Sequence, residues 1–280
     1  MEIARSIEEM RIFRRGRNYG AQLGFVPTMG ALHEGHLSLV RAARARDDVV
    51  VMSIFVNPTQ FGPNEDFASY PRDEERDLER AEDAGVDVVF LPSVEEMYPH
   101  GATTSVSVGR LSTILEGADR PGHFDGVCTI VAKLFNIVSP TSAYFGQKDA
   151  QQVAVVKRMV ADLRFQIEIV VCPTVREGDR LALSSRNTYL GAGEREHASA
   201  LHDALEAGRD VFTSDGPDQA EKAMWELLVA HDLQPSYARV VDPDTFAPAI
   251  EQRRPALLVI AAHLGKTRLI DNLLIEGEDG

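Results

Sequence analysis

The chain is poor in cysteine and in basic residues, and it has no long apolar run. Its two cysteines, Cys128 and Cys172, lie far apart and form no C-x-x-C pair. This argues against a disulfide framework or a zinc ribbon and predicts buried, reduced thiols. No run of about 18 apolar residues exists, so no membrane-spanning helix is expected. Because the N-terminal segment also lacks the apolar core of a secretory signal, we expect a cytosolic protein.

The charge balance of the chain is strongly acidic. Its 280 residues include 43 Asp and Glu but only 29 Lys and Arg, which gives a formal net charge of −14. This balance argues against general nucleic-acid binding, which needs a broad basic surface, but not against a nucleotide ligand. A phosphate site in this chain has to be built from local positive groups.

The first 170 or so residues alternate between strand-like and helix-like segments. The predicted strands are 23–26, 49–56, 87–91, 143–145 and 166–171, and the predicted helices are 73–84, 127–138 and 150–160. Such alternation predicts an α/β fold with a Rossmann-like, doubly wound parallel sheet, in which ligands bind beyond the carboxyl ends of the strands.

The pattern changes in the last third of the chain. Two amphipathic helices, 194–211 and 217–233, precede three strand-like segments, 237–241, 256–262 and 268–274. Helices followed by strands favour a smaller α+β domain. We therefore predict a Rossmann-like, ligand-binding domain over residues 1–174 and an α+β domain over residues 175–280.

The most informative motif, PTMGALHEGH at residues 27–36, lies between a predicted strand and a predicted helix. Exposed N–H groups and the helix dipole attract phosphate at such a turn. Gly30 and Gly35 allow close backbone approach, and His33 and His36 can donate hydrogen bonds to phosphoryl oxygens. On this pattern alone an ordinary polar turn is an equal alternative. Zinc binding is a weaker one because no third ligand is evident nearby.

Further polar loops follow other predicted strands or join the two domains, and each also fits an ordinary loop or a capped helix start. They are residues 57–62 with Asn57 and Gln60, 120–124, 146–149 with Lys148 and Asp149, and 183–187 with Ser184, Ser185 and Arg186. Amide side chains can bind hydroxyl and carboxylate groups, and a guanidinium beside hydroxyls suits phosphate.

An acidic stretch and a lysine near the C-terminus complete the set of candidates. The acidic residues are Asp66, Asp73, Glu74, Glu75 and Asp77. We expect mostly a solvated helix face, of which one or two carboxylates could hold Mg²⁺ beside a nucleotide. Gly265-Lys266-Thr267 is similar to the end of a Walker A loop, but residue 260 is Ile where that motif needs Gly, so we assign Lys266 to a hairpin.

Taken together, the motifs resemble the pantothenate synthetase (pantoate–β-alanine ligase) family over almost the full chain. The matching blocks, in order, are 27–36, 57–62, 70–72, 120–127, 146–149 with Gln152, 184–187 and 265–272. The resemblance implies a nucleotidyltransferase-like Rossmann fold and an ATP-dependent ligase. Such an enzyme adenylates (R)-pantoate with release of pyrophosphate, then transfers the pantoyl group to β-alanine with release of AMP. A homodimer and Mg²⁺ are implied as well.

The resemblance also implies roles for individual residues. His36 matches the catalytic proton donor of the family, Gln60 a residue that binds pantoate and β-alanine, and Gln152 one that binds pantoate. Asp77 resembles a carboxylate near Mg²⁺. The positions that match ATP contacts are Met29, Gly30, Ala31, Leu32, His33, Glu34, Gly35, His36, Gly146, Gln147, Lys148, Asp149, Val175, Leu183, Ser184, Ser185 and Arg186.

One departure and two alternatives stay open. Residues 179–182 read Asp-Arg-Leu-Ala, where the family usually carries Asp-Gly-Leu-Ala, so Arg180 either alters the loop backbone or adds a phosphate contact. The alternatives to a ligase are a nucleotidyltransferase that stops after adenylyl transfer and a nucleotide-binding module without catalysis.

Overall fold

The computed structural model describes residues 1–16, 20–63, 65 and 67–277. The chain divides into two compact units, Met1–Gly146 with Val155–Cys172, and Gln147–Ala154 with Pro173–Gly280. The domain boundary between residues 174 and 175 stays a prediction. Asp66 of the acidic stretch lies outside the described residues.

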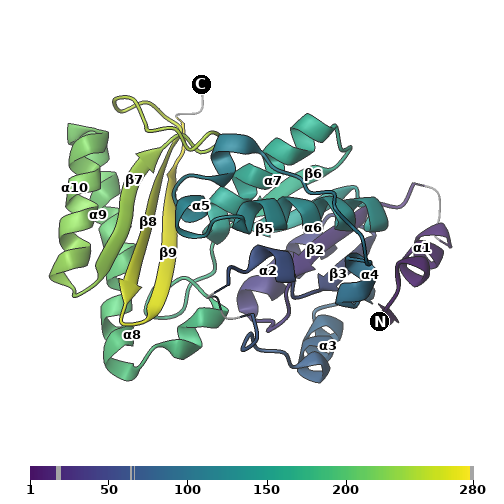
Figure 1. The fold of residues 1–280 in the computed structure, drawn as a ribbon. Helices are drawn as coiled ribbons and strands as arrows, with labels where there is room; N and C mark the ends of the chain where they lie inside the picture. The colour runs from purple at the N-terminus through teal and green to yellow at the C-terminus, as the bar shows by residue number, and fades with distance from the viewer. Residues whose placement is uncertain (17–19, 64, 66, 278–280) are drawn as a thin grey trace. The chain divides into compact units, whose positions relative to one another are not determined.

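The first unit is built on a six-stranded sheet in the order β1-β4-β3-β2-β5-β6, with every neighbouring pair parallel (Figure 1). From β2 the chain proceeds outward through β3 and β4, whereas β5 and β6 lie on its other side. The strand order therefore reverses between β2 and β5, and ligands bind such sheets beyond the carboxyl ends at that point. The strands are β1 (Glu2–Ala4), β2 (Leu23–Thr28), β3 (Val49–Ile54), β4 (Val88–Phe90), β5 (Ser142–Gly146) and β6 (Glu168–Cys172).

Helices cover both faces of this sheet. Val26 of β2 belongs to a buried cluster with Leu39 and Val40 of α2 (Glu34–Arg44). The neighbouring residue Phe25 meets Phe135 of α6 (His123–Val138), with 6.4 Å between ring centroids. Because successive strand side chains point to opposite faces, the predicted doubly wound α/β fold is confirmed. The other helices in this part of the sequence are α1 (Ile7–Arg15), α3 (Glu74–Asp83), α4 (Val94–Met97), α5 (Glu116–Asp119) and α7 (Ala150–Leu163), and the 3₁₀ turns are η1 (Pro58–Gln60), η2 (Gly109–Ser112) and η3 (Gln147–Asp149). Of these, η3 and the first residues of α7 belong to the second unit.

The second unit holds the predicted α+β part, a three-stranded antiparallel sheet β7-β8-β9 packed on helices (Figure 1). Its core joins Leu205, Met224 and Leu258 from α9, α10 and β8. At Gly208 a Cβ atom would lie 2.5 Å from Met224 Cγ, so only glycine lets these helices approach so closely. The elements are η4 (Ser185–Tyr189), α8 (Ala192–Ala198), α9 (Ala200–Asp215), α10 (Pro217–Ala230), β7 (Gln234–Val241), β8 (Ala256–Leu264) and β9 (Thr267–Ile275).

The sequence pattern missed several elements, among them β1, α1, α4 and α5, and merged two others. The single helix predicted over 194–211 is two helices that meet at Ser199, and the amphipathic pattern runs through the junction without a signal. Strand β1 has only three residues, too few to display an alternation. Helix α1 does carry a signal, because Ser6 and Glu9 form a capping box at its start.

The cysteines match their prediction, since Cys128 and Cys172 are both free and buried. Burial raises the pKa of the Cys128 thiol to about 12 and also raises that of Cys172, so neither is a reactive thiolate at neutral pH. No helix in the part of the chain that the structure describes has the length and apolar character needed to cross a membrane.

Candidate active site

The loop after β2 turns sharply at two residues with left-handed backbone. Gly30 has φ +81° and Ala31 has φ +49°. A Cβ atom on Gly30 would lie 2.8 Å from an Asp77 carboxylate oxygen, so the position requires glycine both for its conformation and for space. This turn carries the chain from β2 to His33, which caps α2.

Asp77 holds this loop from helix α3. Its side chain is buried, with 3% exposed. Oδ2 accepts the N–H of Ala31 and Oδ1 accepts that of Leu32, each at 2.8 Å. Arg80, one turn further along α3, donates to the carbonyl of Leu32. The carboxylate predicted near Mg²⁺ therefore also fixes the backbone that leads to the histidines.

His33 and His36 lie together at the N-terminus of α2. Their rings stack with 4.0 Å between centroids and an angle of 29°. Nδ1 of His33 accepts the N–H of Gly35 at 3.2 Å, and Nδ1 of His36 accepts the N–H of His33 at 3.3 Å. Because both Nδ1 atoms accept, the proton of each neutral imidazole belongs on Nε2. The stacked rings thus place two imidazoles at a helix end that favours anions.

Gln60 is held in one orientation by Asn57, which is 1% exposed. Nδ2 of Asn57 donates to Gln60 Oε1 and to the carbonyl of Gly126, both at 3.1 Å. Nε2 of Gln60 lies 2.9 Å from the sulfur of Met29. Asn57 Oδ1 accepts from the phenol of Tyr98 at 2.7 Å and from the hydroxyl and N–H of Thr59 at 3.0 and 3.4 Å. These three donors together determine which end of the Asn57 amide faces Gln60.

Removing the Tyr98 hydroxyl is expected to loosen Gln60 without unfolding the protein. In Tyr98→Phe the Asn57 amide loses the shortest of the bonds to its Oδ1 and keeps those from Thr59, a loss of about 1 kcal/mol. For the substrates that the family resemblance implies, we expect KM for pantoate to rise about five- to tenfold while KM for ATP changes less than twofold. Tyr189→Phe, an exposed tyrosine of η4, is the matched control. Equal changes in both KM values would contradict this role.

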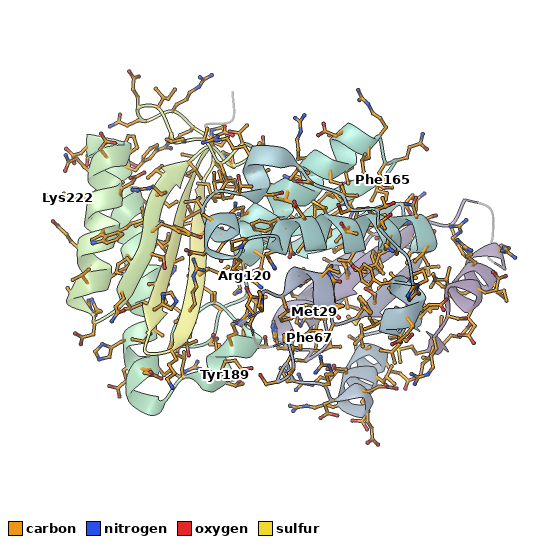
Figure 2. The ribbon with its side chains drawn as sticks, viewed as in Figure 1. Met29, Phe67, Arg120, Phe165, Tyr189 and Lys222 are labelled. Carbon is orange, nitrogen blue, oxygen red and sulfur yellow. The ribbon has the colours of Figure 1, made fainter. Side chains whose placement is uncertain are left out.

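Arg120 and His123 support the backbone of Gln60 (Figure 2 labels Arg120 and Met29). His123 Nδ1 lies 2.8 Å from the Gln60 carbonyl and therefore donates to it, and Nε2 accepts from Arg120 at 3.0 Å. Arg120 also forms a two-bond ion pair with Glu65, at 2.8 and 2.6 Å. Burial acts to raise the pKa of Glu65, but the bonds from Arg120 outweigh it and hold the pKa below its ordinary value.

In the second unit, the predicted residues lie on two segments. Gln147, Lys148 and Asp149 form η3, directly after β5 in the chain, and Gln152 is half-buried in the first turn of α7. Nζ of Lys148 lies 3.4 Å from an Asp149 oxygen.

The second segment is a hairpin-like loop that leads into η4. The N–H of Leu183 donates to the Val175 carbonyl at 2.9 Å. The backbones of Arg176 and Ala182 form an isolated antiparallel β-bridge. Ser184 caps η4 by accepting the N–H of Arg186 at 3.2 Å. These bonds place Val175 and residues 183–186 on one compact loop.

Arg180 adopts the backbone conformation that glycine favours, with φ +71°. Its guanidinium pairs with Asp203 of α9 at 2.7 Å, and both side chains are exposed. Arg180 thus adopts a conformation that the family's usual glycine adopts readily, and its side chain has a protein partner in Asp203. Both effects considered for this departure from the family pattern stay predictions.

Replacing Arg180 with glycine is therefore expected to be nearly neutral. Relief of the left-handed conformation is worth about 1 kcal/mol, and loss of an exposed ion pair costs about as much or less. We expect the free energy of unfolding to change by less than about 1 kcal/mol and KM for ATP by less than twofold. Urea unfolding and steady-state kinetics check both values, and a tenfold rise in KM would instead indicate a phosphate contact.

Local pattern predicted His33, His36, Gln60 and Lys148 as site residues, but two residues that support them received no predicted role. Tyr98 carries no motif, and its hydroxyl acts on Asn57 across 41 positions of sequence. Asn272 lies in block 265–272, which matched the family, but no role was predicted for it there. In the structure it contacts the segment that carries Lys148. Within the described residues, no group of three or more His, Cys, Asp or Glu side chains is arranged to hold a metal ion.

Comparison with known proteins identifies the family. The pantoate–β-alanine ligase family model matches residues 2–274. A pantothenate synthetase of Moorella thermoacetica is 54% identical over the whole of both chains, and one of Acidobacterium capsulatum is 55% identical over 98% of this chain and 94% of its own. These matches confirm the predicted ligase.

Solved structures agree with the sequence matches. A pantothenate synthetase from Thermus thermophilus has a TM-score of 0.93 at 48% identity, covering 99% of this chain and all of its own. A pantoate–β-alanine ligase from Francisella tularensis, complexed with β-γ ATP and β-alanine, has a TM-score of 0.82 at 36% identity, covering 98% and 97%. The chain belongs to the pantoate–β-alanine ligase family.

Proposed function

We propose that this chain condenses (R)-pantoate with β-alanine through a pantoyl adenylate, converting ATP to AMP and pyrophosphate. The observation that carries the proposal is the stacked pair His33 and His36 at the start of α2, in a chain that matches the family over nearly its whole length. The related Francisella protein, which is complexed with β-γ ATP and β-alanine, supports these two substrates.

In the first step a carboxylate oxygen of pantoate attacks the α-phosphorus, and the bond from that phosphorus to pyrophosphate breaks. Charge develops on the phosphoryl oxygens, so catalysis needs donors and positive groups rather than a covalent partner. The Nε2–H groups of His33 and His36 serve as donors, and His36 is the proton donor to the reacting phosphates. Lys148 and Arg186 supply positive charge, which an acidic chain has to provide locally.

Pantoate is bound by neutral amides, those of Gln60 and Gln152. An amide can pair with both a hydroxyl and a carboxylate. Since it adds no positive charge, it leaves the attacking carboxylate nucleophilic. The bond from Asn57 to Oε1 directs Nε2 of Gln60 as the donor toward its ligand.

In the second step the neutral amine of β-alanine attacks the carbonyl carbon of the adenylate. The C–O bond breaks, and that oxygen leaves with AMP while the amine loses a proton. This step needs mainly the correct placement of two bound groups, to which Gln60 contributes by contacting β-alanine.

Mg²⁺ accompanies ATP in this proposal and neutralises charge on its phosphates. Each oxygen of Asp77 accepts one N–H and keeps a further lone pair, so Asp77 fits as one ligand at most. Such an ion takes its remaining ligands from phosphates and water. We also propose that the enzyme is a cytosolic homodimer.

A product assay tests the reaction. With ATP, pantoate and β-alanine present, we expect AMP, pyrophosphate and pantothenate in equal amounts. Turnover must stop when pantoate is omitted. Continuous pyrophosphate release without β-alanine would favour a simple nucleotidyltransferase, release of ADP and phosphate would contradict adenylation, and no turnover at all would favour a nucleotide-binding module.

A further inference from the structure

We propose that Asn272 is a positioning residue that holds Lys148 in place through the backbone of η3. The proposal rests on the proposed function, because it assigns Lys148 to ATP phosphates. Asn272 lies on β9 and is 5% exposed. It therefore acts from within the second unit and not from the surface that meets a ligand.

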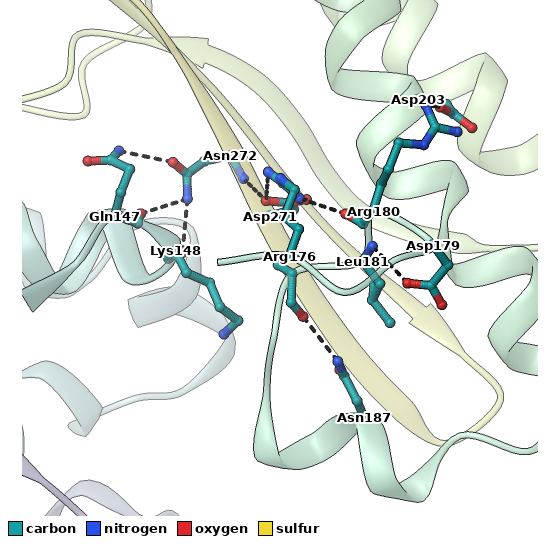
Figure 3. A network of polar contacts seen from close by, with 11 residues as sticks. Gln147, Lys148, Arg176, Asp179, Arg180, Leu181, Asn187, Asp203, Asp271 and Asn272 are labelled. Carbon is teal, nitrogen blue, oxygen red and sulfur yellow. Dashed lines mark hydrogen bonds and ion pairs between the residues drawn. The ribbon is translucent and has the colours of Figure 1, made fainter. Parts of the chain in front are cut away.

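The side-chain amide of Asn272 makes hydrogen bonds to one short segment, residues 147–148 (Figure 3). Its Nδ2 donates to the backbone carbonyls of Gln147 and Lys148, both at 2.9 Å. Its Oδ1 accepts from the side-chain amide of Gln147 at 3.0 Å. Two adjacent carbonyls thus share the two hydrogens of one buried NH₂ group, an arrangement that needs a planar amide.

Asn272 is itself anchored by the neighbouring residue, Asp271. Oδ1 of Asp271 accepts the N–H of Asn272 at 2.8 Å. The same carboxylate, 3% exposed, forms a two-bond ion pair with Arg176 at 2.6 and 3.0 Å. Paired bonds of this kind are strong and directional. Arg176 also donates to the Arg180 carbonyl at 3.1 Å.

Strand β9 therefore supports both candidate ATP segments of the second unit. Asn272 binds the segment that carries Lys148, and Asp271 binds Arg176 in the loop that carries Val175 and Leu183. Figure 3 shows the side chains of Asp271 and Asn272 leaving the same strand. Neighbouring side chains on a strand leave it in opposite directions, so two successive residues can hold two different segments.

The placement of a side-chain charge depends more on a fixed backbone for lysine than for arginine. The ammonium is a point charge on a flexible stem, with no planar group to set its direction. Its position relative to a phosphate consequently depends on where its Cα atom is held. The loss of Asn272 should act on ATP mainly through Lys148, the positively charged residue of the segment that it holds.

The test is a double-mutant cycle between Asn272→Asp and Lys148→Met. Aspartate has the shape of asparagine but cannot donate to the two carbonyls. We expect Asn272→Asp to lower kcat/KM for ATP about ten- to hundredfold and Lys148→Met to lower it about a hundredfold. In the Lys148→Met background, Asn272→Asp should change kcat/KM less than about twofold, since coupled residues are non-additive.

Controls separate positioning from folding. Asn136→Asp, at an exposed site on α6, introduces the same charge away from β9 and should leave the kinetics unchanged. Asn272→Ala removes the donors without adding a carboxylate, and serves if Asn272→Asp does not fold. If the fall in kcat/KM of the double variant equalled the product of the two single effects, the proposal would be overturned.

The same double-mutant cycle can be measured on the affinity for ATP by calorimetry, which requires no turnover. We expect Asn272→Asp to weaken binding in the parent and to have no further effect beside Lys148→Met. This readout stands if the parent makes no pantothenate, so a failure of the proposed reaction is distinguishable from a failure of the positioning role. An unchanged ATP affinity in Asn272→Asp would contradict the proposal.

Discussion

Replacing His36 with alanine is expected to lower kcat about 10²- to 10⁴-fold, the usual contribution of a positioned proton donor. The structure suggests a sharper pair of variants. His36→Asn keeps a group near the Nδ1 position, which can still accept the N–H of His33, but it lacks the donor at Nε2. His36→Gln places an N–H near the Nε2 position. We therefore expect the asparagine variant to be about as slow as the alanine variant. The glutamine variant, whose amide can donate a hydrogen bond but cannot give up a proton, should recover only the part of the rate that hydrogen bonding at Nε2 supplies.

Steady-state kinetics and thermal unfolding check this prediction together. His231→Asn, at the exposed end of α10, is the matched control and should leave kcat unchanged. If His36→Ala turned over like the parent, His36 would have no part in the chemistry. If asparagine restored the rate and glutamine did not, the bond at Nδ1 would matter rather than the donor at Nε2.

Replacing Asp77 with alanine is expected to lower the free energy of unfolding by about 3 kcal/mol, because it removes two hydrogen bonds to a buried charged group. The N–H groups of Ala31 and Leu32 then lose their acceptor, and Ala31 has to keep its left-handed backbone without that support. Since the loop leads directly to His33, we also expect kcat/KM for ATP to fall about a hundredfold.

Urea unfolding in the absence of nucleotide separates the two roles of Asp77. A lower midpoint with an unchanged m-value indicates a loss of stability. Glu79→Ala, an exposed residue of the same helix, should change stability by less than about 0.5 kcal/mol. If Asp77 served only Mg²⁺, Asp77→Ala would unfold like the parent and would merely need more Mg²⁺ for activity. That outcome would contradict the structural role.

The sequence predicted those parts of the site that local pattern encodes. A strand, two glycines, two histidines and an apolar helix face follow one another within about 20 residues, and the structure has β2, the turn and α2 in that order. Gln60 and Asn57 are likewise three positions apart on one 3₁₀ turn. Such short-range features depend on backbone conformations that residue types determine directly.

The supporting contacts were beyond prediction because they join distant parts of the chain. Asp77 binds Ala31 across 46 positions, and Asn272 binds Lys148 across 124. Each of these side chains has many possible partners in a sequence, and only the packing of α3 or β9 selects one. The acidic stretch containing Asp77 was expected to be mostly a solvated helix face, and Glu74 and Glu75 of the same first turn are exposed. No local pattern distinguishes the buried Asp77 from these neighbours.

The pantoyl adenylate itself is tested most directly by isotope transfer. With pantoate labelled by ¹⁸O in both carboxylate oxygens, the oxygen that attacks the α-phosphorus leaves with AMP when the amide forms. We predict one ¹⁸O atom in the phosphate of each AMP and the other in the amide carbonyl of pantothenate, measured by mass spectrometry. Unlabelled AMP, or label in inorganic phosphate, would contradict the proposed mechanism.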